Sequence, residues 1–202
     1  MKTIIFVRHG ESESNVAKIQ ANEIDKYPLT ARGRLQVEQL TQELALTRPN
    51  ALYSSPVLRA AQTAEIISRR LNVQVQANVA LTERDWGRAN GTIVSTFEEE
   101  VDLCLAADRY GIESISSITK RVAEFMESLG SGISVAVTHA DIIRGALVHA
   151  LGISYDEFSS YGIVPEKATM SVVQMRQGKL SVVAIGAPRA TDTMLRTTNL
   201  DS

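Results

Sequence analysis

Short apolar runs alternate with longer segments of helical periodicity along most of this 202-residue chain. Four runs have the length and composition of buried strands, namely 4–7, 51–53, 73–75 and 133–137. Five segments show apolar residues at helical spacing or helix-start signals, namely 29–44, 55–71, 92–107, 115–129 and 141–151. Two further runs, 170–175 and 180–185, flank a polar turn and predict a hairpin.

Residues at the ends of these segments support the helix predictions. Thr30 is expected to cap the helix that follows it, because a threonine oxygen can accept a free backbone amide. Ser55 followed by Pro56 predicts another helix start, since the fixed φ of proline suits a first turn. Gly130 and Gly132 are expected to close the helix over 115–129.

The alternation of strands and helices predicts an α/β fold. We expect a three-layer α/β/α sandwich, with a mostly parallel sheet and helices on both faces. The length favours a single domain over residues 1–202. The stretch between 84 and 115 holds more helix than one crossover needs, so we expect a small helical cap insertion within it.

Composition narrows the class of protein. A net charge of −2 gives no reason to expect a nucleic-acid partner or an anionic membrane. The single cysteine, Cys104, excludes an internal disulfide. There is no secretory leader and no apolar stretch of membrane-spanning length, so a cytoplasmic location is expected. A homodimer through the terminal hairpin or tail is left open.

Two histidines follow predicted strands. His9 comes after the first strand and is preceded by Arg8, while His139 ends the run at 133–137. Arg59 lies at a third such turn, after the predicted strand 51–53. Because reactive loops gather beyond the carboxyl ends of parallel strands, these side chains are expected to share one site. Arginines paired with imidazoles suit a phosphate monoester better than a metal, so we expect a small phosphorylated metabolite as partner, with no metal and no cofactor.

Five ordered segments carry a resemblance to a known family. They are Val7-Arg8-His9-Gly10-Glu11-Ser12 with Asn15, and the stretches 28–33, 54–64, 81–91 and 138–144. Together they resemble the histidine phosphatase superfamily, in its phosphoglycerate mutase-like branch. One departure is Ala140, where family members usually have glycine after the second histidine.

The resemblance implies a role for each residue of the site. His9 is the nucleophile that becomes phosphorylated, and Arg8, Asn15, Arg59 and His139 bind the phosphoryl group. Nearby Arg8 and Arg59 are expected to lower the pKa of His9 and keep it neutral. Glu83 is expected to protonate the leaving group and then to activate water.

The sequence defines the contacts to the non-phosphate end of the substrate less sharply. The candidate contacts are Tyr27, Arg84, Trp86, Arg88, Arg109 and Tyr110. Arg144 is expected to form a structural ion pair instead. A phosphatase is favoured, because the stretch at 98–102 is short and acidic where mutases of the family carry a longer basic insertion. A cofactor-dependent phosphoglycerate mutase-type phosphotransferase is the alternative, and an inactive member that binds phosphorylated ligands is the third reading.

Overall fold

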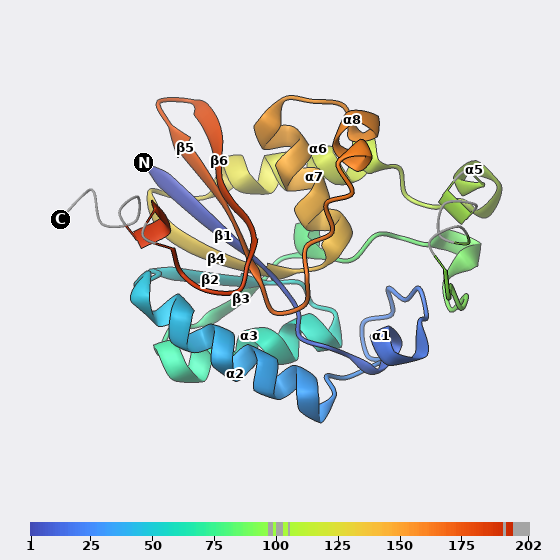
Figure 1. Ribbon diagram of the computed structural model, residues 1–202, viewed down its shortest axis with the longest axis horizontal. Coiled ribbons are helices and arrows are strands. Elements are labelled where there is room, and N and C mark those ends of the chain that lie inside the picture. Colours follow the sequence, from blue (N-terminus) through green and yellow to red (C-terminus); the bar gives the residue numbers. More distant parts are fainter. Residues whose placement is uncertain (97–98, 100–102, 105, 192, 196–202) are drawn as a thin grey trace.

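The computed structural model describes residues 1–96, 99, 103–104, 106–191 and 193–195. In that part of the chain, six strands form one sheet in the order β3-β2-β4-β1-β5-β6 (Figure 1). The strands are β1 (Lys2–Arg8), β2 (Ala51–Ser54), β3 (Val75–Ala77), β4 (Gly132–Thr138), β5 (Met170–Arg176) and β6 (Lys179–Ala187). The strands β1 to β4 pair in parallel with one another, whereas β5 pairs antiparallel with both β1 and β6. The predicted mostly parallel α/β sheet and its terminal hairpin are confirmed.

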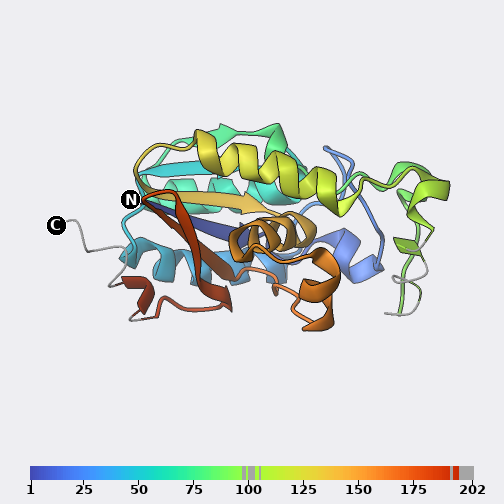
Figure 2. The same ribbon diagram turned by 90° about the horizontal axis from the view of Figure 1, so that it is seen from above.

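Helices cover both faces of this sheet. The helices are α1 (Glu13–Ala17), α2 (Ala31–Leu46), α3 (Leu58–Leu71), α5 (Ala107–Tyr110), α6 (Ile115–Ser128), α7 (Ala140–Leu151) and α8 (Tyr155–Ser160), with short 3-10 turns η1 (Val79–Leu81) and η2 (Gly87–Ala89). Figures 1 and 2 show α2 and α3 on one face and α6 and α7 on the other. The described helices are not long and apolar enough to cross a membrane.

The central strand β1 is buried on both faces, which explains its unbroken apolar sequence. Ile4 and Phe6 pack into the apolar core beneath α6 and α7. Ile5 and Val7 point the other way, into the core beneath α2 and α3. All four side chains are at most 1% exposed. Alternate residues of one strand therefore hold the two helical layers on a common sheet.

The helix-start predictions had different outcomes. Thr30 caps α2 as predicted, because its side-chain oxygen accepts the Gly33 amide at 3.0 Å. The prediction that Ser55 starts α3 is wrong, since this helix begins at Leu58 with Val57 as its N-cap. The Ser55 hydroxyl instead accepts the Val57 amide at 3.2 Å, which forms a separate turn between β2 and α3.

The predicted third strand is displaced along the chain. It was expected at 73–75 and runs instead over Val75–Ala77, because parallel pairing with β2 aligns Leu52 with Val75. The strand is therefore located by its pairing with the short β2, and not by the apolar composition of residues 73–75.

The helix predicted at 92–107 falls partly outside the described residues. Among those that are described, Glu99, Leu103 and Cys104 are helical and α5 begins at Ala107, whereas Ile93 forms an isolated bridge with Ile19. Figure 2 shows α5 protruding from the body of the sheet. A small apolar cluster around Trp86 and Ile112 packs beneath it. A functional cap within 84–115 stays a prediction.

The loop that follows β1 packs directly against the start of α2. A Cβ added to Gly33 would lie 2.0 Å from the Glu11 carbonyl oxygen, and one added to Gly10 would lie 2.5 Å from the Gly33 carbonyl oxygen. Only glycine allows two backbones to approach this closely. This contact fixes the path of the chain immediately after His9.

Candidate active site

Three parallel strand ends lie side by side, and backbone hydrogen bonds fix where the chain leaves each of them. The His9 amide donates to the Thr138 carbonyl at 3.0 Å, and the Ser55 amide donates to the Val137 carbonyl at 2.9 Å. His139 follows directly after Thr138 and serves as the N-cap of α7. The sheet therefore brings the two imidazoles together, with ring centroids 5.2 Å apart.

His9 is held as a neutral imidazole with an unprotonated Nε2. Its Nδ1 lies 2.7 Å from the Gly10 carbonyl oxygen, which can only accept a proton, so the ring hydrogen is on Nδ1. Arg59 Nε donates to His9 Nε2 at 3.1 Å, which requires a lone pair on Nε2. The pKa of His9 is well below its usual value, first because of burial and then because of the positive charges of Arg59 and Arg8.

His139 is oriented by a serine behind it. Its Nε2 lies 2.9 Å from the Ser55 hydroxyl oxygen, which already accepts the Val57 amide. A Ser55 hydroxyl hydrogen directed at Nε2 leaves the single ring proton on Nδ1. Nδ1 faces Glu83 Oε2 at 3.4 Å and is buried without a hydrogen-bond partner in the described part of the chain. Burial, followed by the charge of Arg59, lowers the pKa of His139 well below its usual value.

Two guanidinium groups flank His9, and only some of the nitrogens in each have a hydrogen-bond partner in the described part of the chain. Arg59 Nη2 donates to the Ala21 carbonyl at 2.8 Å and lies 3.4 Å from Glu83 Oε2. Arg8 Nη1 donates to the Pro165 carbonyl at 2.7 Å. Among the described residues, however, the buried atoms Arg59 Nη1 and Arg8 Nε have no partner. Because buried donors are normally paired, these atoms are suited to an anionic ligand.

Glu83 is a carboxylic acid with an unusually high proton affinity. Its pKa is raised to about 7, first because of burial and then because of the negative charge of Asp141. The Arg59 guanidinium opposes that rise, and the Arg84 amide donates to Glu83 Oε1 at 3.0 Å. The group can therefore give up or take a proton near neutral pH.

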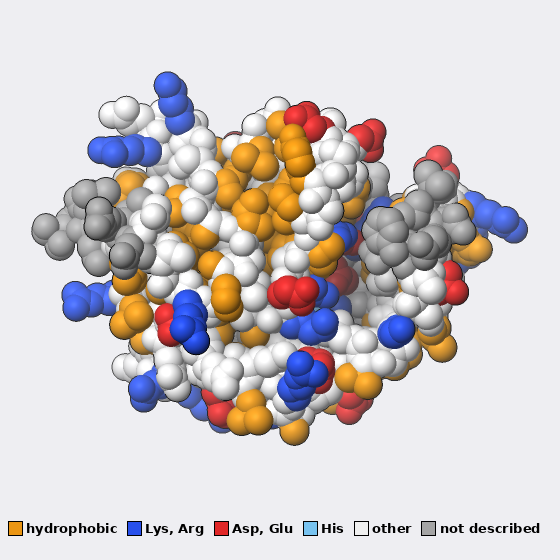
Figure 3. Space-filling model, in the orientation of Figure 1, with side chains coloured by type: hydrophobic (Ala, Val, Ile, Leu, Met, Phe, Trp, Pro, Cys, Tyr) orange, Lys and Arg blue, Asp and Glu red, His pale blue; other side chains and the backbone are white. Residues whose placement is uncertain are grey.

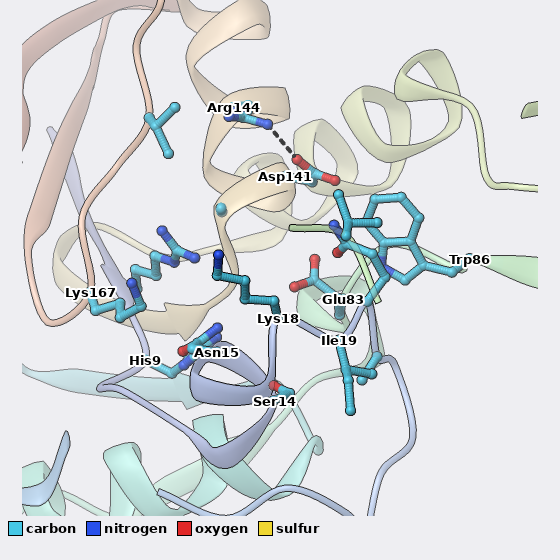
Figure 4. Close-up of a pocket in the computed structure, with 16 residues that line it drawn as sticks. His9, Ser14, Asn15, Lys18, Ile19, Glu83, Trp86, Asp141, Arg144 and Lys167 are labelled. Atoms are coloured by element: carbon cyan, nitrogen blue, oxygen red, sulfur yellow. Dashed lines mark hydrogen bonds and ion pairs between the residues drawn. The ribbon is translucent and has the colours of Figure 1, made fainter. Parts of the chain in front are cut away.

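A cavity of about 290 Å³ opens above these groups. Its lining consists of Arg8, His9, Ser14, Asn15, Lys18, Ile19, Gln20, Ala21, Glu83, Trp86, Val94, Ala140, Asp141, Arg144, Val164 and Lys167. Figure 3 shows basic and acidic side chains around a hollow between the sheet body and the part of the chain that carries α5. Figure 4 shows His9 and Asn15 on one side of the cavity, with Glu83 and Trp86 on the other.

The six residues predicted to bind and transfer a phosphoryl group lie close together. Arg59 and His139 do not line the cavity itself, but they contact His9 and Glu83, which do. Asn15 lies on the lining, and its Oδ1 accepts the Ser12 amide at 3.1 Å. The amide hydrogens of Asn15 are therefore left for another acceptor.

The residues predicted for the substrate's other end are placed differently from one another. Trp86 is the one member of the set among the lining residues. Arg84 lies behind Trp86, with its guanidinium carbon 5.2 Å from the ring centroid and its Nε donating to the Glu113 carbonyl. Arg84 is buried, so it supports the wall of the cavity instead of forming it.

The remaining four substrate-end candidates lie outside the cavity lining. Arg88 donates to the Arg109 carbonyl, and the Arg109 guanidinium lies 5.9 Å from the Tyr110 ring centroid. Arg88 belongs to η2, and Arg109 and Tyr110 belong to α5, while Tyr27 lies in the loop before α2 with a φ of 56°. These arginines and aromatics were expected to suit the substrate's other end, but the side chains of Arg88 and Arg109 contact neighbours within this group.

Sequence reasoning missed several residues that line the cavity. Lys18 and Lys167 belong to no motif and come from loops. Asp141 could have been found, because it lies in the first turn of the helix that opens at His139. Arg144 does form the expected ion pair, with Asp141 at 2.9 Å, yet it also lines the cavity.

The same centre contains three groups of the kind that ligate metals. Donor atoms of His9, Glu83 and His139 all lie within 4.8 Å of one another. A cation there would have to displace the Arg59 N–H from His9 Nε2 and would face two guanidinium groups. Electrostatics at this centre therefore favours an anion.

Comparison with known proteins identifies the class to which this fold and site belong. The family model of the histidine phosphatase superfamily (branch 1) matches residues 4–188. The chain is a member of that superfamily.

Individual relatives include both mutases and phosphatases. The chain is 33% identical to a 2,3-bisphosphoglycerate-dependent phosphoglycerate mutase of Thermoplasma acidophilum, over 99% of this chain and 100% of the relative. It is 30% identical to phosphoserine phosphatase 1 of Hydrogenobacter thermophilus, over 88% of each chain. A solved mycobacterial glucosyl-3-phosphoglycerate phosphatase shares the fold, with a TM-score of 0.79 at 20% identity, over 93% of this chain and 100% of that one.

The hydrogen bond between Ser55 and His139 generates a testable prediction. Ser55→Ala removes the group that holds the proton of His139 on Nδ1, so turnover of a phosphate monoester is expected to fall roughly tenfold, the equivalent of one hydrogen bond. Steady-state kinetics measures the loss. Ser54→Ala is the matched control, because the Ser54 hydroxyl is equally buried and donates to the Ser55 carbonyl instead. Equal losses in the two variants would assign Ser55 a purely structural role.

Proposed function

We propose that this protein is a phosphatase that hydrolyses a small phosphate monoester through a phosphohistidine on His9. One observation carries the proposal. The residues that flank the unprotonated His9 Nε2 carry three buried donors that have no partner among the described residues: Arg8 Nε, Arg59 Nη1 and His139 Nδ1. Positive and polar donors fixed around a nucleophile are what a phosphoryl group needs in its transition state.

The first step transfers the phosphoryl group to the enzyme. The Arg59 Nε–H that His9 Nε2 accepts turns to a phosphoryl oxygen of the bound substrate, and the Nε2 lone pair then attacks phosphorus while the bond from phosphorus to the ester oxygen breaks. The carboxylic acid of Glu83 gives its proton to that oxygen, so the leaving group departs as an alcohol. Arg8 and Arg59 neutralise the charge on the phosphoryl oxygens while the bonds exchange, and the Nδ1–H of neutral His139 donates a hydrogen bond to them.

The second step returns the enzyme to its starting state. The Glu83 carboxylate takes a proton from water, and the resulting hydroxide attacks phosphorus. The bond from phosphorus to His9 Nε2 breaks, which yields inorganic phosphate and a neutral imidazole. Glu83 is again protonated, so the cycle balances in protons.

The size of the cavity supports a small substrate. A volume of about 290 Å³ lies near the bottom of the range for ligand pockets, roughly 300–1,000 Å³. Trp86 and Ile19 supply apolar surface on the lining, while most of the rest is polar. The cavity therefore suits a phosphorylated metabolite of a few carbon atoms.

A mutase is the second candidate, supported by the full-length similarity to the Thermoplasma acidophilum mutase. In that reaction, a hydroxyl of a second molecule would replace water as the acceptor of the phosphoryl group from His9. The chemistry at His9 and Glu83 is the same, so only the fate of the phosphoryl group distinguishes the two activities.

We also propose that the reaction needs no metal and takes place in the cytoplasm. The argument for the first is electrostatic, since Arg8 and Arg59 already neutralise the phosphoryl charge that a metal would otherwise bind. The second rests on the single cysteine, because proteins with few cysteines and no disulfide framework are typical of a reducing compartment.

His9→Ala tests the nucleophile. We expect this variant to lose at least about 1,000-fold in phosphate release from p-nitrophenyl phosphate, because it removes the unprotonated nitrogen that Arg59 and the other donors flank. Excess chelator should leave the wild-type rate unchanged. His149→Ala is the control, since this third histidine lies in the last turn of α7 and away from the site.

Each outcome of this test has a definite meaning. Activity that survives in His9→Ala, or that disappears with chelator, would contradict the proposal. A coupled mutase assay with 2,3-bisphosphoglycerate runs beside it. Isomerisation that outpaces phosphate release would replace the phosphatase with the mutase. Intact ligand binding without turnover of a broad ester panel would identify an inactive binding protein.

The pKa of Glu83 generates a prediction for pH dependence. Because the acid form donates the proton and its pKa is about 7, kcat/KM for an alkyl phosphate should fall as pH rises through about 7. Glu83→Gln should remove this decline and lower kcat/KM roughly 100-fold or more. The loss should be smaller for p-nitrophenyl phosphate, because nitrophenolate leaves without a proton.

Two comparisons check the assignment of Glu83. Glu65→Gln, on the exposed surface of α3, should keep the wild-type pH profile. An equal loss for alkyl and aryl esters in Glu83→Gln would show that this residue does not protonate the leaving group.

A further inference from the structure

The loop 164–169 is bonded to the strand end that carries Arg8 and His9. The Ala168 amide donates to the Arg8 carbonyl at 3.0 Å and contacts the His9 carbonyl at 3.3 Å, while the Arg8 amide donates to the Thr169 carbonyl. Arg8 Nη1 adds a fourth bond, to the Pro165 carbonyl. The path of this loop is therefore set by the active-site strand.

Ala168 has a backbone conformation that non-glycine residues rarely adopt. Its φ is +52°, in the left-handed region, which is disfavoured for any residue with a Cβ. The bonds to Arg8 and His9 hold it there. As a result, the preceding residue, Lys167, lies on the wall of the cavity.

Lys167 is held in an unfavourable electrostatic position. It is half-buried and lies near the Arg8 guanidinium, and burial and that positive charge both lower its pKa. The carboxylates of Glu166 and Glu11 oppose the effect, but in the described part of the chain neither forms an ion pair with Lys167. A cation kept among like charges is stabilised when an anion enters the cavity.

Other charges face the same cavity from different elements. Arg144 comes from α7 and Lys18 from the C-cap of α1. The lining carboxylates are Asp141, bonded to Arg144, and Glu83, which contacts Arg59. Lys18 donates to a neutral partner, the Ser95 carbonyl, at 3.2 Å. Positive charge on the lining thus exceeds what its two carboxylates neutralise.

We propose that Lys167, with Arg144 and Lys18, binds a second anionic group of the substrate while the transferred phosphoryl group lies at His9. The preferred substrates are then small phosphate monoesters that also carry a carboxylate or a second phosphate. The inference rests on the proposed function and narrows its substrate class. In the view of Figure 4, Lys18 reaches between Lys167 and Glu83, and Arg144 lies on the far side from His9.

This subsite weakens one argument that the sequence offered for a phosphatase over a mutase. The short acidic stretch at 98–102 lacks the basic residues that grip a second anionic group in mutases of the family. The structure shows basic side chains on the cavity from α1, from α7 and from the loop before β5. Recognition of a second anion therefore does not require a basic insertion.

Three phosphate monoesters of similar size test the proposal: 2-phosphoglycolate, with a carboxylate; ethyl phosphate, with a neutral end; and O-phosphoethanolamine, with an ammonium. The wild-type protein should show kcat/KM for 2-phosphoglycolate at least about tenfold above that for ethyl phosphate, with O-phosphoethanolamine lowest. The preference should shrink as ionic strength rises, because salt screens charges that are partly exposed.

Lys167→Met removes the charge and keeps the apolar stem. It should reduce the ratio of kcat/KM for 2-phosphoglycolate over ethyl phosphate about tenfold. Lys120→Met, on the exposed side of α6, is the control and should leave that ratio unchanged. If Lys167→Met lowers both values equally, Lys167 binds the transferred phosphoryl group and the proposal is wrong. A wild-type protein without preference overturns it as well.

Calorimetric binding of 2-phosphoglycolate and ethyl phosphate separates this proposal from the proposed function. Tighter binding of 2-phosphoglycolate, lost in Lys167→Met, supports the subsite even if none of the three esters is turned over. In that case the proposed hydrolysis fails while the second anion site stands. Equal affinities for the two ligands contradict the subsite whatever the catalytic result.

Discussion

The hydrogen bond from Arg59 Nε to His9 Nε2 is the contact on which the rest of the site depends. A guanidinium can only donate, so this bond requires an unprotonated Nε2. The same guanidinium contacts Glu83 and the Ala21 carbonyl, and it thereby fixes the nucleophile and the acid relative to each other. Arg59 is itself buried in α3, so the helix layer beneath the sheet sets the geometry.

Burial shifts the pKa values of His9 and Glu83 in opposite directions, and both shifts favour the reaction. Removing water disfavours charge, which lowers the pKa of a histidine and raises that of a glutamate. His9 is therefore neutral and able to attack, while Glu83 holds its proton near pH 7 and can donate it. The arginines strengthen the first effect and weaken the second. Asp141, close to Glu83, restores the balance by raising its proton affinity.

Much of the architecture could be predicted from sequence because it depends on local patterns. The apolar run around Ile5 indicated a strand buried on both faces, and parallel pairing then placed His9 beside His139. Features that depend on tertiary register were not accessible. The turn at Ser55 resembled a helix cap, yet the hydroxyl contacts His139 from the end of the neighbouring strand β2. Lys167 reaches the cavity from a loop in which the next residue, Ala168, adopts a left-handed φ, and no sequence pattern indicated this conformation.

The predictions for the substrate's non-phosphate end show what the sequence did not determine. Arg84 and Trp86 adjoin Glu83 in the sequence, but only Trp86 reaches the cavity, because the Arg84 guanidinium turns back to the Glu113 carbonyl. Side-chain direction in irregular segments is set by such contacts, whereas in strands it alternates by rule. Residues of the strand ends were therefore more predictable than those of the loops.

Trapping the enzyme intermediate is the most direct test of the central claim that His9 Nε2 accepts the phosphoryl group. Glu83→Gln should form the phosphoenzyme from p-nitrophenyl phosphate and break it down slowly, since it lacks the base that activates water. Rapid quenching under alkaline conditions, followed by peptide mass spectrometry, should locate one phosphoryl group on the imidazole of His9. A phosphoryl group on any other side chain, or turnover without a covalent intermediate, would contradict the account.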